Sequence, residues 1–145
     1  MARDTTTGSD YEAIIATCIE RSCRKNGLTS LSQSMVGEKP GGGKHRIDWE
    51  IFSTVDPSNR GLISCKFQQT SGTAEEKIAY EVIKLLHTMK IDSRYKHGWI
   101  VMGGKGWSAG ILNFVKKELP FYLPLMQGKV TIVSTDEFIQ SGVAL

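Results

Sequence analysis

The chain has 145 residues and a formal net charge of +3, with 40% hydrophobic and 23% charged residues. This length and composition are typical of a single globular domain with one core, which we expect to span residues 1–145. No apolar run reaches the roughly 18–20 residues that a membrane helix requires, and residues 1–10 have no signal-peptide core. We therefore expect a cytoplasmic protein that does not contact a membrane.

The N-terminal part of the chain predicts a helix followed by a strand. Apolar residues recur at helical spacing from Tyr11 to Ile19, which indicates an amphipathic helix that ends near residues 26–27. Ser9 and Glu12 have the spacing of a capping box at the start of this helix. Residues 30–36 are predicted as a short strand.

The central part of the chain predicts an antiparallel hairpin. After a glycine-rich turn at residues 38–44, residues 46–52 alternate apolar and polar side chains, which is the period of a strand. Residues 56–61 have the composition of a turn. Residues 62–68 form the next predicted strand, so the two strands are expected to pair.

The remaining sequence predicts helices that alternate with strands. The expected elements are a helix over about 73–89, a strand over 99–102, a helix over 108–119 capped by Ser108, a strand over 130–133 and a helix over 136–140. Pro120 and Pro124 are expected to interrupt the chain. Alternating helices and strands imply parallel crossovers, whereas the hairpin is antiparallel, so the sequence predicts an α/β domain with a mixed sheet.

The two hairpin strands are expected to collect polar groups on one face. Asp48 points away from the face that carries Ile47, Trp49 and Ile51. On the next strand the residues that share one face are Ser64, Lys66 and Gln68. Since same-face residues of paired strands lie within ~5 Å of each other, we expect these four side chains to cluster.

Such a cluster suits the hydrolysis of a phosphodiester bond. An aspartate together with a second acidic group can hold Mg²⁺, which prefers hard oxygen ligands. The metal would lower the pKa of a bound water. Lys66 can orient that water or compensate negative charge that develops on the phosphate, and Gln68 can orient water or phosphate by hydrogen bonds.

The segments Arg46-Ile-Asp48 and Ile63-Ser-Cys-Lys66-Phe-Gln68 resemble the hairpin motif of the PD-(D/E)XK nuclease superfamily. The predicted order of elements is similar to the α-β-β-β-α-β core of that superfamily, which implies a restriction-endonuclease-like mixed sheet flanked by helices. By position, Asp48 corresponds to the aspartate of the motif and Lys66 to its lysine. Glu12 matches the acidic residue that many members carry on the first helix.

Ser64 departs from the motif, because it stands where the acidic residue two before the lysine is expected. Some members carry serine there and take a glutamate from the following helix, for which Glu76 and Glu81 are the candidates here. Glu76 is also explained as the capping partner of Thr73. The alternative is that Ser64 marks an inactive site.

The resemblance implies an endonuclease of homing, restriction or junction-resolving type that hydrolyses double-stranded DNA with Mg²⁺, for which Mn²⁺ can substitute. The implied catalytic residues are Asp48, Lys66, Ser64, Gln68 and Glu12. The implied metal ligands are Asp48, Glu12 and Glu81. Basic residues that can contact DNA phosphates are Lys39, Lys44, Arg46 and Lys105. A homodimer or higher homo-oligomer would supply two active sites.

Two other classes of protein stay open from the sequence. One is a DNA-binding module that kept the nuclease fold but lost its metal site at Ser64. The other is a protein that binds a small phosphate ligand through the loop Gly103–Gly106, although this loop does not follow the GxxxxGK[ST] pattern of phosphate loops.

Overall fold

The computed structural model describes residues 8–68 and 74–145. The elements of its first half are α1 (Gly8–Asn26), β1 (Leu28–Glu38), β2 (Lys44–Ser53), β3 (Arg60–Phe67) and α2 (Ala74–Ile91). The elements of its second half are β4 (Tyr95–Gly103), α3 (Ala109–Asn113), η1 (Phe114–Glu118), α4 (Leu119–Tyr122), η2 (Pro124–Met126), β5 (Val130–Ser134) and α5 (Thr135–Ser141).

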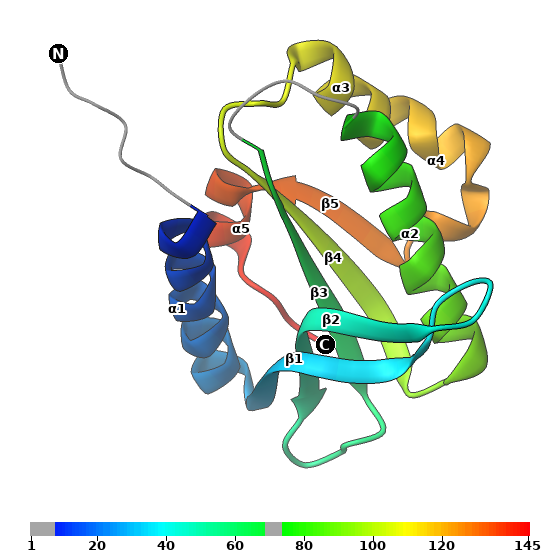
Figure 1. Cartoon of the computed structure of the whole chain (residues 1–145). Helices are drawn as coiled ribbons and strands as arrows, with labels where there is room; N and C mark the ends of the chain where they lie inside the picture. The colour runs from blue at the N-terminus through cyan, green and yellow to red at the C-terminus, as the bar shows by residue number, and fades with distance from the viewer. Residues whose placement is uncertain (1–7, 69–73) are drawn as a thin grey trace, which may run out of the picture.

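The strands form one five-stranded sheet in the order β1-β2-β3-β4-β5. The first three strands are antiparallel neighbours, whereas β3, β4 and β5 run parallel to one another. Helices α1 and α5 cover one face of the sheet, and α2, α3 and α4 lie on the other face (Figure 1). The mixed sheet with flanking helices confirms the predicted α/β fold.

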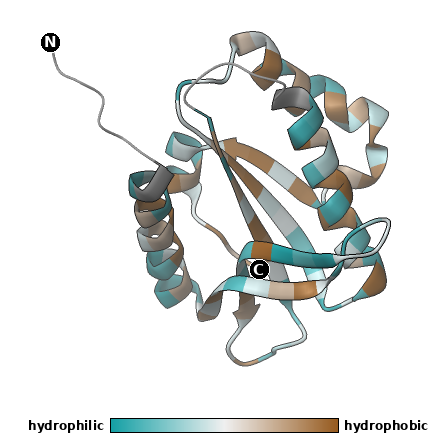
Figure 2. Ribbon diagram, in the orientation of Figure 1, coloured by the Kyte–Doolittle hydropathy of each residue, from teal (hydrophilic) through white to brown (hydrophobic). Residues whose placement is uncertain are grey.

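The sheet separates two hydrophobic cores. The core on the α2 side includes Leu62, Ile78, Val82, Leu85 and Ile100. The core on the α1 side includes Tyr11, Ile15, Ile19, Ile63 and Val101. Hydrophobic residues follow β3 and β5 through the centre of the molecule (Figure 2), because these strands are covered on both faces. The Tyr11 hydroxyl donates a hydrogen bond of 2.9 Å to the Val101 carbonyl and ties α1 to β4.

Strand β2 does not keep one regular face along its whole length. Ile47 packs in the core on the α2 side, whereas Trp49 and Ile51 pack in the core on the α1 side. The prediction that these three residues share a face is therefore wrong. Pairing between β2 and β3 extends only from Trp49–Ile63 to Phe52–Arg60, so β2 leaves β3 at Asp48 and the simple alternation of a flat strand ends there.

The helical segment after β4 starts as predicted and ends later than predicted. The Ser108 hydroxyl accepts a hydrogen bond from the amide of Ile111 and caps α3, which confirms the predicted cap. Pro120 does not end the helix, which continues to Tyr122. The preceding turn is a π-helix in which the Leu119 amide bonds to the Phe114 carbonyl, and this wider turn admits a residue without an N–H near its end.

None of the helices in residues 8–68 and 74–145 is long and apolar enough to cross a membrane. Ser9 is described only in its backbone, and Thr73 lies outside the described residues. The predicted capping boxes Ser9–Glu12 and Thr73–Glu76 therefore remain predictions.

Candidate active site

Asp48 lies at the point where β2 separates from β3. Its Oδ2 accepts a hydrogen bond of 2.7 Å from the backbone amide of Cys65. The last residue of β3 that pairs with β2 is Ile63, so the Asp48 carboxylate bonds an amide just beyond the end of the backbone ladder. The aspartate is thus fixed against β3 by a local departure from regular sheet geometry.

A second carboxylate reaches the same strand from α2. The Ser64 hydroxyl donates a hydrogen bond of 2.6 Å to Glu81 Oε1, and the Lys66 ammonium lies 3.2 Å from Glu81 Oε2. The Lys84 ammonium, one helical turn along α2, lies 2.8 Å from the same oxygen. Ser64 is 1% exposed and Glu81 4% exposed. The helix therefore places a buried carboxylate beside the serine that stands at the acidic position of the motif.

Position on α2 explains why Glu81 and not Glu76 reaches the site. The two glutamates are five residues apart in the sequence, which corresponds to well over one turn of helix and points them in different directions. Glu76 is exposed, whereas Glu81 lies on the face that packs against the sheet. Lys66 and Lys84 also lie beside Glu81 and balance its charge.

The two carboxylates have shifted pKa values of opposite sign. Burial raises the pKa of Asp48, and the hydrogen bond from the Cys65 amide and the Lys66 charge offset only part of this shift. Burial also acts to raise the pKa of Glu81, but the Lys66 charge and the hydrogen bonds from Lys84 and Ser64 outweigh it, so the pKa is lowered. Glu81 is therefore firmly ionised at neutral pH, while the charge on Asp48 is only partly compensated.

This donor set suits a hard divalent cation. Within the described residues, no group of three or more His, Cys, Asp and Glu side chains is arranged to hold a metal ion. Mg²⁺ does not need such a group, because proteins usually hold it through one or two carboxylates and leave the other positions to water and substrate phosphate. A cation bound at Asp48 would also relieve the uncompensated burial of that carboxylate.

Two other predicted catalytic residues lie apart from this cluster. Glu12 is exposed on α1 and lines a cleft of about 540 Å³ together with Trp49. In the described part of the chain it forms no hydrogen bond or ion pair with Asp48 or Lys66. The Gln68 amide does not join the polar face either, since it donates to the Gly106 carbonyl at 3.1 Å. It ties the end of β3 to the loop after β4.

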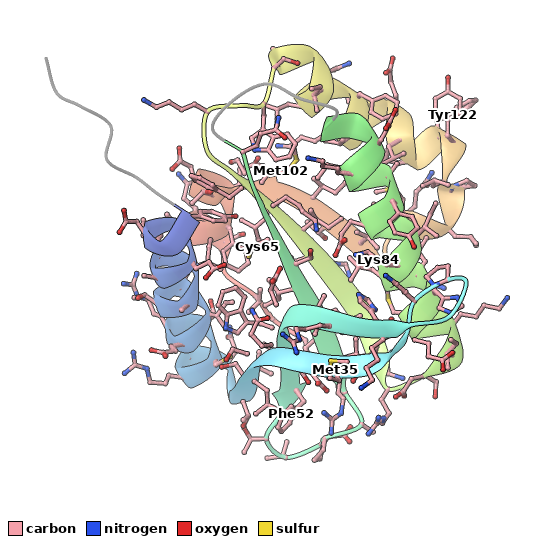
Figure 3. The ribbon with its side chains drawn as sticks, viewed as in Figure 1. Met35, Phe52, Cys65, Lys84, Met102 and Tyr122 are labelled. Carbon is pink, nitrogen blue, oxygen red and sulfur yellow. The ribbon has the colours of Figure 1, made fainter. Side chains whose placement is uncertain are left out.

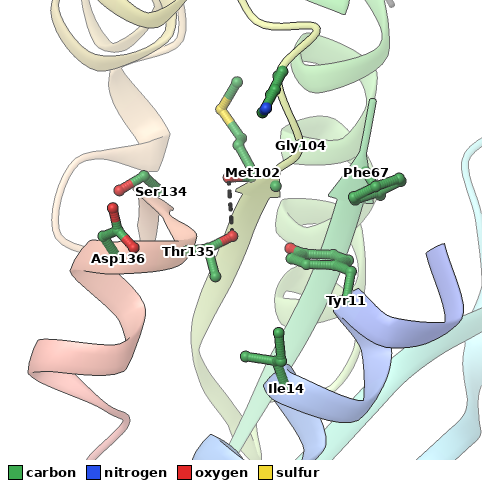
Figure 4. Close-up of a pocket in the computed structure, with 10 residues that line it drawn as sticks. Tyr11, Ile14, Phe67, Met102, Gly104, Ser134, Thr135 and Asp136 are labelled. Atoms are coloured by element: carbon green, nitrogen blue, oxygen red, sulfur yellow. Dashed lines mark hydrogen bonds between the residues drawn. The ribbon is translucent and has the colours of Figure 1, made fainter. Parts of the chain in front are cut away.

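The predicted DNA-binding residues fall in two places. Lys39, Lys44 and Arg46 are exposed at the tip of the β1–β2 hairpin, and Arg46 is two residues from Asp48. Lys105 lies in the loop after β4, where it lines a cleft of about 300 Å³ with Tyr11 and other residues (Figure 4).

The loop cleft offers little support for a small phosphate ligand. The carboxylate of Asp136 is among the side chains that line it, beside Ser134 and Thr135 (Figure 4). A negative group in the lining opposes an anion, and Lys105 is the single basic residue of the lining set. The β1–β2 hairpin, by contrast, carries three exposed basic residues, Lys39, Lys44 and Arg46.

Lys84 and His45 were not among the predicted site residues. Lys84, labelled in Figure 3, contacts Glu81 from the next turn of α2, and the Glu81–Lys84 spacing is the one signal in the sequence for this pair. His45 is buried, and its Nδ1 lies 2.9 Å from the Thr88 hydroxyl of α2. Burial and the Lys84 charge lower the pKa of His45, so the imidazole is neutral at neutral pH.

Glu50, two residues after Asp48, is a buried carboxylate of a different kind. It accepts hydrogen bonds from Arg60 at 2.5 Å, Ser34 at 2.7 Å and Tyr95 at 2.9 Å. These hydrogen bonds come from β1, β3 and β4, and the charge of Arg60 balances that of Glu50. Glu50 is therefore a structural residue that ties β1, β2, β3 and β4 together.

Comparison with known proteins agrees with this arrangement. A family model described as the PD-(D/E)XK nuclease superfamily domain matches residues 7–142. The chain belongs to this superfamily, as the sequence resemblance indicated. Its members are generally nucleases, which act on nucleic acid and typically use divalent metals, so membership supports a nuclease-type function. No curated protein matches the chain.

Proposed function

We propose that the chain is a Mg²⁺-dependent endonuclease that hydrolyses phosphodiester bonds of double-stranded DNA, with Mn²⁺ able to substitute. The observation that supports this most strongly is the buried contact between Ser64 and Glu81 beside Lys66. Through this contact Glu81 places a carboxylate beside Ser64, the residue at which the sequence departs from the nuclease motif. A site that had decayed would not require a buried glutamate at that place.

The proposed roles follow from the contacts of each side chain. Asp48 and Glu81 would hold the cation, which when bound stabilises charge on the phosphate and lowers the pKa of a water. Lys66, held 3.2 Å from Glu81, orients the attacking water or shields the charge that develops on the phosphate. Ser64 orients Glu81 through its hydrogen bond.

The proposed partner is a DNA duplex bound by a homodimer or higher homo-oligomer. A single small site cuts one strand, and two copies related by symmetry would present two sites to the duplex. Lys39, Lys44 and Arg46 on the hairpin tip would contact the phosphate backbone. Homing, restriction and junction-resolving enzymes are the candidate subclasses, and the proposed location is the cytoplasm.

A plasmid-nicking assay tests this function. Supercoiled plasmid is incubated with the protein and Mg²⁺, Mn²⁺ or EDTA, and the products are separated on an agarose gel. The proposal predicts nicked or linear DNA with either metal and intact plasmid with EDTA. Intact plasmid with every divalent metal, together with retained DNA binding, would instead indicate a non-catalytic DNA-binding module.

Neutralising the hairpin lysines is expected to weaken DNA binding regardless of sequence. In the variant Lys39→Ala/Lys44→Ala, each lost phosphate contact should reduce the slope of log K against log salt by about one unit. Fluorescence anisotropy with two unrelated duplexes over a series of salt concentrations measures this slope. An unchanged slope would show that the lysines are only solvated. Lys117→Ala/Lys129→Ala, which removes two exposed lysines away from the hairpin, controls for the loss of net charge.

Lys66→Ala is expected to lower the cleavage rate by about 10²–10⁴-fold, the usual effect of losing a group that assists proton transfer. Lys84→Ala is the matched control, because Lys84 contacts the same Glu81 oxygen as Lys66. If charge balance at Glu81 were the whole role of Lys66, the two variants would lose similar activity. Single-turnover cleavage of a labelled duplex should show a much larger loss for Lys66→Ala.

A further inference from the structure

Gln33 lies directly across from Asp48 on the neighbouring strand β1. The pairs Ser32–Trp49 and Ser34–Ile47 enclose this position, and the register shifts only beyond Met35. Among the described residues Gln33 is the one non-glycine residue with a positive φ, at 50°. No inserted residue accounts for this conformation, because the register is continuous on both sides of Gln33.

The left-handed conformation is unfavourable for a residue with a side chain, and glutamine is not among the residues enriched there. Such outliers persist where the surroundings hold them and often occur at functional sites. Here the Gln33 side chain counteracts part of the rise in the pKa of Asp48, which faces it from β2. Gln33 also lines the cleft of about 540 Å³ between α1 and β1, so the residue is accessible at its position across from Asp48.

We propose that Gln33 is a positioning residue that holds the Asp48 carboxylate in place through its side-chain amide. Asp48 lies where β2 leaves β3, so regular pairing with β3 no longer fixes its orientation. The Cys65 amide on β3 donates to it, and the Gln33 amide, across from it on β1, would hold it from a second strand. We call this arrangement of Gln33 and Asp48 the clamp. Its importance for catalysis rests on the proposed nuclease function, but the clamp itself does not.

Two substitutions distinguish the effect of the Gln33 side chain from the effect of its backbone conformation. Gln33→Glu keeps the length and the backbone requirement but replaces the amide donor with a carboxylate that repels Asp48. Gln33→Gly removes the side chain and accepts a positive φ without strain. Met35→Gly is the control, since Met35 lies two residues along the same strand and is 47% exposed.

The test is amide hydrogen exchange of Cys65, measured by NMR in EDTA, because this amide donates to Asp48 Oδ2. Loss of the clamp should accelerate Cys65 exchange by about fivefold in both Gln33 variants, as expected for one weakened hydrogen bond. Gln33→Gly should keep the melting temperature of the wild type. Met35→Gly should lower the melting temperature and leave Cys65 exchange relative to its neighbours unchanged.

Unchanged Cys65 exchange in Gln33→Glu would overturn the inference, whether or not the protein cleaves DNA. If the wild type cleaves DNA, both Gln33 variants should also lower the single-turnover rate by about tenfold or more, because a misplaced catalytic group reduces the rate steeply. If the wild type cleaves no DNA but exchange accelerates as expected, the proposed function fails and the positioning role of Gln33 stands.

Discussion

Asp48→Asn is expected to abolish DNA cleavage while the protein stays folded and binds DNA. Asparagine keeps the size of the side chain and can still accept a hydrogen bond from the Cys65 amide, but it lacks the anionic oxygens that Mg²⁺ requires. Removing a negative charge from a surface that faces phosphates should leave DNA affinity equal or higher. Plasmid nicking and fluorescence anisotropy on the same preparation measure the two effects.

The stability of this variant gives an independent check. Because burial raises the pKa of Asp48, its charge opposes folding at any pH above that pKa, and the opposition disappears as the pH falls and the group is protonated. In EDTA at neutral pH, Asp48→Asn should therefore melt at the same or a higher temperature than the wild type. A large loss of stability would mean that Asp48 is a structural residue.

Glu50→Gln is the matched control on the same strand. It makes the same change from acid to amide, but it removes the partner of the largely buried Arg60. Leaving a buried charge unpaired should cost about 3 kcal/mol of stability. The two variants should thus behave oppositely: Asp48→Asn loses activity and keeps stability, whereas Glu50→Gln loses stability.

Ser64→Glu is expected to impair cleavage, although it restores the acidic residue of the motif. Ser64 Oγ lies 2.6 Å from Glu81 Oε1, and both residues are buried. Two carboxylates cannot both ionise easily at that separation, so one would take up a proton or move away. The cleavage rate should fall by about tenfold or more, since the metal ligands would be displaced.

The double variant Ser64→Glu/Glu81→Ala moves the carboxylate from α2 to β3. Glu81→Ala alone should lose cleavage almost completely, and the double variant should recover a substantial part of it, because one carboxylate again lies beside Lys66. Higher activity of Ser64→Glu alone would contradict the account. It would mean that Ser64 is a decayed ligand and that Glu81 does not hold the metal.

The fold and the hairpin motif could be predicted from the sequence because they depend on local patterns. The alternation around Asp48 and Lys66 defines two strands, and the order of helices and strands restricts the topology. Ser108 was recognisable as a helix cap from its position alone. Family membership is confirmed over residues 7–142, which agrees with the resemblance carried by those residues.

The choice among the acidic residues depends on how the elements pack. Glu76 and Glu81 both follow Lys66 in the sequence, and only the docking of α2 on the sheet distinguishes them. Glu12 matched a position on the first helix, but α1 lies on the other face of the sheet from Glu81. Spacing along the chain does not show which of these acidic residues lies beside Ser64 and Lys66.

The local geometry around Asp48 also escaped prediction. Perfect alternation would place Ile47 and Trp49 on one face, but β2 leaves β3 between them. Gln33 carries no sequence signal for a positive φ, which is normally expected at glycine or asparagine. Gln68 fits the alternation of its strand, but the strand ends at Phe67 and the Gln68 amide turns to the loop at Gly106.

The most direct test of the proposed metal site is an anomalous difference map from crystals of the protein bound to a short DNA duplex and soaked in Mn²⁺. A metal held by both carboxylates should give a peak within direct ligand distance of oxygens of Asp48 and Glu81, about 2.0–2.6 Å for hard cations. The peak should be absent in Asp48→Asn crystals. A Mn²⁺ peak that contacts Glu12 and not Glu81, or no peak beside Asp48 with DNA bound, would contradict the proposed metal site.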